Sequence, residues 1–280
     1  MTLKFVKESI YILSLLSFLV VTSCQSDETE KVSNSELTTE EALEAVLEND
    51  ISSGIESVIE DDVVLEELSV KGTVAKNNHP ECLTRTIEET AGSKKVTLDF
   101  GTACTGKKGH VFAGKISIEY TRVEGGFLKT VTFENFSVDG NAVVGTIVVS
   151  KVRENIDGHP ERTYSIDLSI TLKTGETITK KGEKIKEMIE GYDTHDRGDD
   201  VFLISGFWKS VNKAGKEVNV TITTDLRREY ACKYIVSGVV EVTRGERSYT
   251  IDFGDGSCDS NATITDAAGN TKEIILKDRY

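Results

Sequence analysis

The number and spacing of the cysteines indicate that this chain forms either disulfides or a metal site. Besides Cys24 near the start, four cysteines follow: Cys82, Cys104, Cys232 and Cys258. An even set of thiols forms disulfides when a chain is exported, and these four can pair in more than one way. A zinc ion is the alternative, but zinc-binding cysteines usually come in pairs about two to four residues apart, and no two cysteines here are so close. We therefore expect disulfides and no metal site.

The first residues of the chain predict export and lipid attachment. Lys4 and Lys7 precede the largely apolar stretch Ile10–Val21, which is too short for a membrane-spanning helix of about 20 residues. The stretch ends in Val21-Thr22-Ser23-Cys24, which resembles the lipobox of bacterial lipoproteins. This resemblance implies cleavage before Cys24 and acylation of its thiol. An ordinary secretory signal with an incidental cysteine is the alternative.

A short acidic run, Gln25–Glu30, follows the lipobox. It is similar to the export tag of surface lipoproteins of the Bacteroidota. The resemblance implies a place in the outer membrane, contact with that membrane through the lipid on Cys24, and display on the cell surface. A solvated spacer on a periplasm-facing protein is the alternative, because acidic and polar residues suit a spacer equally well.

The later cysteines lie in a repeated unit. Each unit has a cysteine, a gap, a strand-like run ending in Asp-Phe-Gly, a turn of small residues and a second cysteine. The shared order predicts one disulfide inside each unit, Cys82–Cys104 and Cys232–Cys258. The runs 97–106 and 250–259, with the lipobox, resemble uncharacterised lipoproteins of the Bacteroidota. That resemblance implies no particular activity.

Most of the chain has the pattern of antiparallel strands. From about residue 70, apolar and polar residues alternate, most clearly at 115–120, 164–172 and 217–223. Such alternation places one face of a strand on the core and the other in water. Turn dipeptides separate the runs: Gly125-Gly126, Asp139-Gly140, Thr174-Gly175, Ala214-Gly215 and Ala268-Gly269. We expect an all-β fold of about ten to twelve strands, an antiparallel meander forming a sandwich or a barrel-like sheet.

Residues 37–68 predict a helical segment before the strands. Thr38–Glu41 resembles an N-cap with an acidic first turn. Apolar residues then recur at helical spacing: Ala42, Ala45, Val46, Ile51, Ile55 and Ile59. A helical stalk and a helix packed on the β domain both remain open. The predicted organisation is a signal peptide at 1–23, a tether at 24–36, a helical spacer at 37–68 and a β domain at 69–280.

The net charge of the chain disfavours binding to nucleic acid, and the spacing of its acidic loops does not favour a metal site. The chain has 33 basic and 47 acidic residues, a net charge of −14, whereas binding to phosphates needs a basic surface. Aspartates crowd two loops without the EF-hand spacing, and we interpret them as turn formers rather than calcium ligands. They are Asp193, Asp196, Asp199 and Asp200 in one loop, and Asp252, Asp255 and Asp259 in the other.

The remaining candidate residues are also better explained by structural roles than by catalysis. Asp-Phe-Gly, at 99–101 and 252–254, matches a kinase magnesium motif but lacks its companion motifs, so we interpret it as a strand end. Phe207 and Trp208 face opposite sides of one strand, and one of them should be core. No catalytic residue and no cofactor is predicted. The histidines lie in expected loops outside any metal-ligand motif: His79, His110, His159 and His195.

Taken together, these features predict a lipid-anchored envelope protein and favour a binding role over an enzymatic one, without deciding between them. Its expected role is binding an extracellular ligand or partner, such as a glycan or another envelope protein. One alternative is a glycan-active hydrolase, whose paired carboxylates leave no fixed sequence motif. A purely structural envelope protein is the other. The sequence predicts no oligomeric state.

Overall fold

The computed structural model describes residues 55–56, 58–59, 80–90, 93–106, 109–194, 196–212 and 214–276. The predicted signal peptide, Cys24, the tether and most of segment 37–68 lie outside the described residues, as do His79 and His195. Within the described part, no helix is long and apolar enough to cross a membrane.

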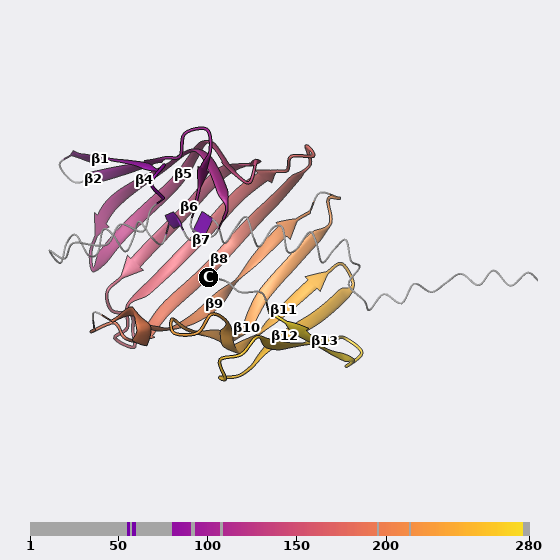
Figure 1. Cartoon of the computed structure of the whole chain (residues 1–280). Helices are drawn as coiled ribbons and strands as arrows, with labels where there is room; N and C mark the ends of the chain where they lie inside the picture. The colour runs from indigo at the N-terminus through magenta and orange to yellow at the C-terminus, as the bar shows by residue number, and fades with distance from the viewer. Residues whose placement is uncertain are drawn as a thin grey trace, which may run out of the picture. The chain divides into compact units, whose positions relative to one another are not determined.

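In the part of the chain that the structure describes, fourteen strands make up one antiparallel sheet (Figure 1). Each strand pairs with the next along the chain, except that β2 pairs with β4 instead of β3, and the two-residue β3 pairs with β4 beside the main path. The prediction of an all-β antiparallel meander is confirmed. The strands are β1 (Thr84–Thr90), β2 (Ser93–Asp99), β3 (Cys104–Thr105), β4 (Val111–Val123), β5 (Gly126–Val138), β6 (Asn141–Val152), β7 (Glu161–Thr171), β8 (Thr177–Glu190), β9 (Val201–Val211), β10 (Glu217–Glu229), β11 (Ile235–Arg244), β12 (Arg247–Asp255), β13 (Asn261–Asp266) and β14 (Thr271–Ile275).

The closure of the sheet differs from the prediction. Among the described strands, β1 pairs only with β2 and β14 only with β13, so the sheet is open and forms neither a sandwich nor a barrel-like sheet. Strand alternation reveals that one face is buried but not what buries it. Helical residues, described below, cover part of that face instead of a second sheet.

The structure has turns at the positions that the sequence predicted. The pairs Asp139-Gly140, Thr174-Gly175, Ala214-Gly215 and Ala268-Gly269 each lie in the connection between two consecutive strands. Asp139 and Gly140 have φ of 50° and 77°. Two successive positive φ values match the twist of a two-residue hairpin, which explains the Asp-Gly choice.

Both clusters of buried apolar side chains lie on one face of the sheet, which we call the covered face. The first cluster comes from β2 to β8, with fully buried members such as Ile118 and Val131. The second comes mainly from β10 to β13, with Trp208 of β9 packed against it. Polar residues such as Glu119 and Asp167 alternate on the opposite, exposed face. Trp208 is therefore the core member of its pair, and Phe207 is 57% exposed.

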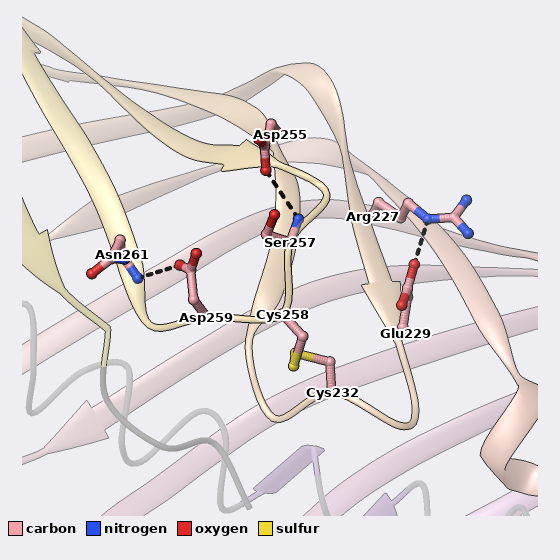
Figure 2. Close-up of a disulfide and its surroundings, with 8 residues drawn as sticks. All are labelled: Arg227, Glu229, Cys232, Asp255, Ser257, Cys258, Asp259 and Asn261. Atoms are coloured by element: carbon pink, nitrogen blue, oxygen red, sulfur yellow. Dashed lines mark hydrogen bonds and ion pairs between the residues drawn. A yellow bond between two sulfur atoms is a disulfide. The ribbon is translucent and has the colours of Figure 1, made fainter.

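Each repeated cysteine unit closes on itself. The disulfides join Cys82 to Cys104 and Cys232 to Cys258, the pairs that the shared order predicted. The joined residues are 22 and 26 positions apart, so each bond contributes about 3 kcal/mol in the chain-entropy description. The second disulfide ties the β10–β11 connection to the loop after β12 (Figure 2).

A glycine inside β6 provides a test of how tightly the strands pack. A Cβ on Gly145 would lie 2.1 Å from the carbonyl oxygen of Asp167 on β7, and its φ is +125°. Gly175, in the β7–β8 turn, also has a positive φ, but nothing lies within 4 Å of a Cβ there. We expect Gly145→Ala to lower the free energy of unfolding by about 3 kcal/mol and Gly175→Ala by only about 1 kcal/mol. Urea unfolding of both variants checks this, and equal losses would contradict the steric explanation.

Candidate functional site: basic residues on the covered face

Four described residues of segment 37–68 are helical and lie on the covered face. Ile55, Val58 and Ile59 are 0%, 8% and 2% exposed and belong to the first core cluster. Residues three and four apart share one side of a helix, so these three present a single apolar edge to the sheet. Of the two arrangements left open by the sequence, these residues show packing on the β domain.

Two lysines on the sheet hold this helical piece at its ends. Lys129 of β5 is completely buried, and its Nζ donates a hydrogen bond to the carbonyl oxygen of Ile59 at 3.0 Å. Lys184 of β8 forms an ion pair with Glu56, with Nζ 2.6 Å from a carboxylate oxygen. Both are strong contacts, because a charged donor roughly doubles the strength of a hydrogen bond.

Strand register explains why these two lysines act together. Tyr120, Lys129, Val149, Tyr164 and Lys184 are successive cross-strand neighbours on β4 to β8. We call this line the docking row. Its members share one face because directly opposite residues in an antiparallel pair project to the same side.

A second line of residues lies two positions further along each strand, and we call it the basic row. Lys151 on β6 is opposite Arg162 on β7, and Arg162 is opposite Lys186 on β8. All three side chains are partly buried. Two residues along a strand is about 7 Å, so the basic row runs beside the docking row. Its remaining members are Arg122 and Phe127 on one side and Ile204 and Leu226 on the other.

Aromatic rings accompany the cations on this face. Each lysine nitrogen lies over a ring at a separation where a cation is attracted by the π-electrons. The distances from Nζ to the ring centroid are 5.6 Å for Lys129 and Tyr120, 5.8 Å for Lys151 and Phe127, 5.1 Å for Lys180 and Trp208, 5.1 Å for Lys184 and Tyr164, and 4.4 Å for Lys186 and Phe202.

Like charges directly opposite one another destabilise a sheet, and a buried charge is costly unless it is compensated, so the cations of this face require interactions that offset their charge. Lys180, Lys184 and Lys186 lie on β8, between the two apolar clusters, where an apolar side chain would be the ordinary choice. A basic patch of this kind is suited to holding negative charge next to apolar surface.

The acidic loops form turns, as the sequence indicated. The backbone N–H groups of Gly254, Ser257 and Asn261 donate to Asp252, Asp255 and Asp259 at 2.9, 3.1 and 2.8 Å, two residues away in each case. Figure 2 shows the last two of these contacts. Hydrogen bonds from Ser257 lower the pKa of Asp255, so this carboxylate remains charged while it caps its turn.

The second acidic loop and the first Asp-Phe-Gly have the same turn geometry. Asp196 accepts the N–H of Gly198 at 2.8 Å, and Asp199 accepts the hydroxyl of Thr194 at 3.0 Å. Asp99 accepts the N–H of Gly101 at 2.9 Å, as Asp252 does in the other copy. Among the described residues, no three side chains of His, Cys, Asp or Glu gather as metal ligands would.

Two histidines form pairs with carboxylates at the ends of strands. His110 Nδ1 is 2.7 Å from Asp139, and His159 Nδ1 is 2.7 Å from Glu187. Asn155 joins the second pair by donating to Glu187 at 3.0 Å and to Glu161 at 3.2 Å. This cluster fixes the β6–β7 connection to the end of β8. The sequence indicated turns here but not these partners, because the pairing depends on strand register.

The docking row and the basic row were not identified from the sequence. A signal was nevertheless present in β8, where Lys180, Lys184 and Lys186 have the same parity as Ile178 and Met188. A strand that places lysines in phase with its buried residues departs from ordinary alternation. The stretch 177–190 alone does not reveal which parity faces the core.

The Glu187 cluster gives an acid-dependent contribution to stability. The Asn155 hydrogen bond lowers the pKa of Glu187, burial partly opposes this, and the contact with His159 lowers it further. A lowered pKa in the folded state stabilises the protein above the unfolded pKa near 4.5, and this stabilisation is lost as the pH falls through the folded value. We expect Glu187→Gln to cost about 1 kcal/mol at pH 7 and progressively less as the pH falls below the unfolded pKa and through the lowered folded pKa of Glu187. Urea unfolding across this pH range checks it.

A matched control lies on the same strand. Glu183→Gln makes the same change on the same exposed face of β8, away from Asn155 and His159. Its effect on unfolding should be small at every pH. A pH dependence as large as that of Glu187→Gln would assign the effect to general charge rather than to the cluster.

No family model, no curated protein and no solved structure matches this chain. The site itself is therefore the basis on which its function is inferred. The features that carry the inference are the basic row, the aromatic rings beside it and the helical piece on the docking row.

Proposed function

We propose that this chain is a lipid-anchored, cell-surface binding protein of the outer membrane, and that its covered face binds an anionic amphiphile. The observation that carries the proposal is the direct register of Lys151, Arg162 and Lys186 on the buried side of a sheet whose chain has net charge −14. The lipobox and acidic run at the start of the sequence support the anchor and its location.

The surroundings of the basic row suit a ligand with an acyl chain and a negatively charged head. The lysine and arginine side chains of the basic row supply charge-assisted hydrogen bonds to the carboxylate or phosphate of the ligand's head. Ile204 and Leu226 continue the same row, and Phe202 and Met188 lie opposite each other two residues further along. An acyl chain laid over these residues would leave water while the head remains at the cations.

Binding fits the described residues better than hydrolysis. A glycosidase of the ordinary kind needs one carboxyl held protonated by a raised pKa. Glu161 and Glu187 form a close carboxylate pair through Asn155, but the pKa of Glu187 is lowered, which favours the ionised form. These groups are accounted for by their role in the β6–β7 connection.

A displacement assay tests the proposal. The probe is a dansyl-labelled undecanoic acid, added to the mature chain carrying Cys24→Ser, which removes the lipid and retains every described residue. We expect saturable binding, and Lys186→Gln should weaken it about tenfold, because a charge-assisted contact contributes about 1.5 kcal/mol. Oleate and an oleoyl lysophosphatidate compete in separate arms and distinguish a carboxylate head from a phosphate head.

The controls separate recognition from non-specific charge and apolar effects. Lys181→Gln removes the same charge from the exposed face of β8, where Lys181 pairs with Asp167 at 2.9 Å, and should change binding less than about twofold. Mono-olein has the chain without the charge and should compete poorly. Equal effects of Lys181→Gln and Lys186→Gln, or equal competition by mono-olein and oleate, would refute the proposal.

A further inference from the structure

We propose that β1 is a self-pairing edge strand, through which two copies of this chain join their sheets around a two-fold axis. The observation that carries the proposal is the charge pattern of this strand, which is complementary to itself in antiparallel register. The dimer is inferred from residues 84–90 and does not rest on the ligand proposed for the covered face.

The outer side of β1 is suited to receive a further strand. Among the described strands β1 pairs only with β2, and Figure 1 shows it at one margin of the sheet. Six of its seven residues are exposed. Ile87 is 44% exposed although it lies directly opposite Val96, which is fully buried. Because an edge strand presents a row of backbone N–H and C=O groups, a strand added beside β1 would gain hydrogen bonds and also cover Ile87.

A two-fold axis at Ile87 matches the charges of two β1 strands. In this antiparallel register, Ile87 faces Ile87 of the second copy, and Arg85 of each copy faces Glu89 of the other. Each remaining position pairs a threonine with a threonine or with a glutamate, so no like charges are opposed. Opposite charges across a strand pair are stabilising, and directly opposite residues share a face. The covered faces of both copies therefore lie on the same side of the joined sheet.

Neighbouring registers of the same pair lose this match. Moving the two-fold axis to Thr86 opposes Arg85 to Ile87 and leaves no pair of opposite charges. Moving it to Glu88 opposes that glutamate to its own counterpart, and like charges directly opposite one another are destabilising. The charges of β1 thus select one register, in the way that side-chain pattern fixes the register of strands within a sheet.

The strand at the other edge of the described sheet, β14, lacks this complementarity. Its two charged residues, Lys272 and Glu273, are consecutive, so they lie on opposite faces and cannot be opposed in a two-fold pair whose covered faces match. A head-to-tail pair of β14 with β1 fares no better, because opposing Lys272 to Glu89 also opposes Glu273 to Glu88. The pairing of β1 with β1 is therefore the favoured contact between copies.

Sedimentation equilibrium of the mature chain carrying Cys24→Ser tests this dimer. We expect a monomer–dimer equilibrium, and Arg85→Glu and Glu89→Arg should each raise its dissociation constant at least about tenfold, because each substitution opposes like charges twice in the dimer. An equimolar mixture of the two variants should recover dimers to within about threefold of the original constant, because each copy supplies the charge that the other has lost.

The mixture separates pairing between copies from effects within one copy. Glu89 lies 3.6 Å from the Nζ of Lys94 on β2, and Glu89→Arg disturbs this contact in the mixture as much as it does alone. Glu273→Lys reverses an exposed charge on β14 and should leave the equilibrium unchanged. The absence of a dimer at every concentration, the absence of recovery in the mixture, or equal weakening by Glu273→Lys would overturn the proposal. Thermal unfolding followed by Trp208 fluorescence verifies that each variant is folded.

A single introduced thiol then tests the register. Ile87→Cys places two thiols directly opposite each other, with Cα atoms about 4.5 to 5.5 Å apart, so mild oxidation should give a disulfide-linked dimer. In Thr90→Cys the two thiols lie six residues out of register, about 20 Å apart, and should not form a disulfide. Cross-linking of Thr90→Cys that is as efficient as that of Ile87→Cys would place the two copies in another register and refute the assignment.

Discussion

A single-layer sheet with one apolar face must have that face covered, and the rest of this structure depends on how the cover is held. Burial of side chains such as Ile118, Val131 and Leu168 removes apolar surface from water only if something lies against them. Ile55 and Ile59 supply part of that contact from a segment that precedes the sheet in sequence. The hydrogen bond from Lys129 to the Ile59 carbonyl therefore helps to hold this part of the cover on the sheet.

The position of β8 gives this constraint a functional side. A sheet this wide has two apolar clusters rather than one, and the lysines of β8 lie between them. The strand carries charges in phase with Ile178 and Met188, next to rings such as Tyr164 and Trp208. The contact with a negatively charged apolar body that we propose would use these charges.

The sequence predicted those parts of the fold that depend on local chemistry. Alternation predicted antiparallel strands, Asp139-Gly140 predicted a hairpin, and the repeated unit predicted Cys82–Cys104 and Cys232–Cys258. Aspartates such as Asp255 were correctly interpreted as turn formers, because their partners are only two residues away. The open edges of the sheet and the alignment of Lys151, Arg162 and Lys186 could not be predicted. Both depend on register between strands, which no local pattern records.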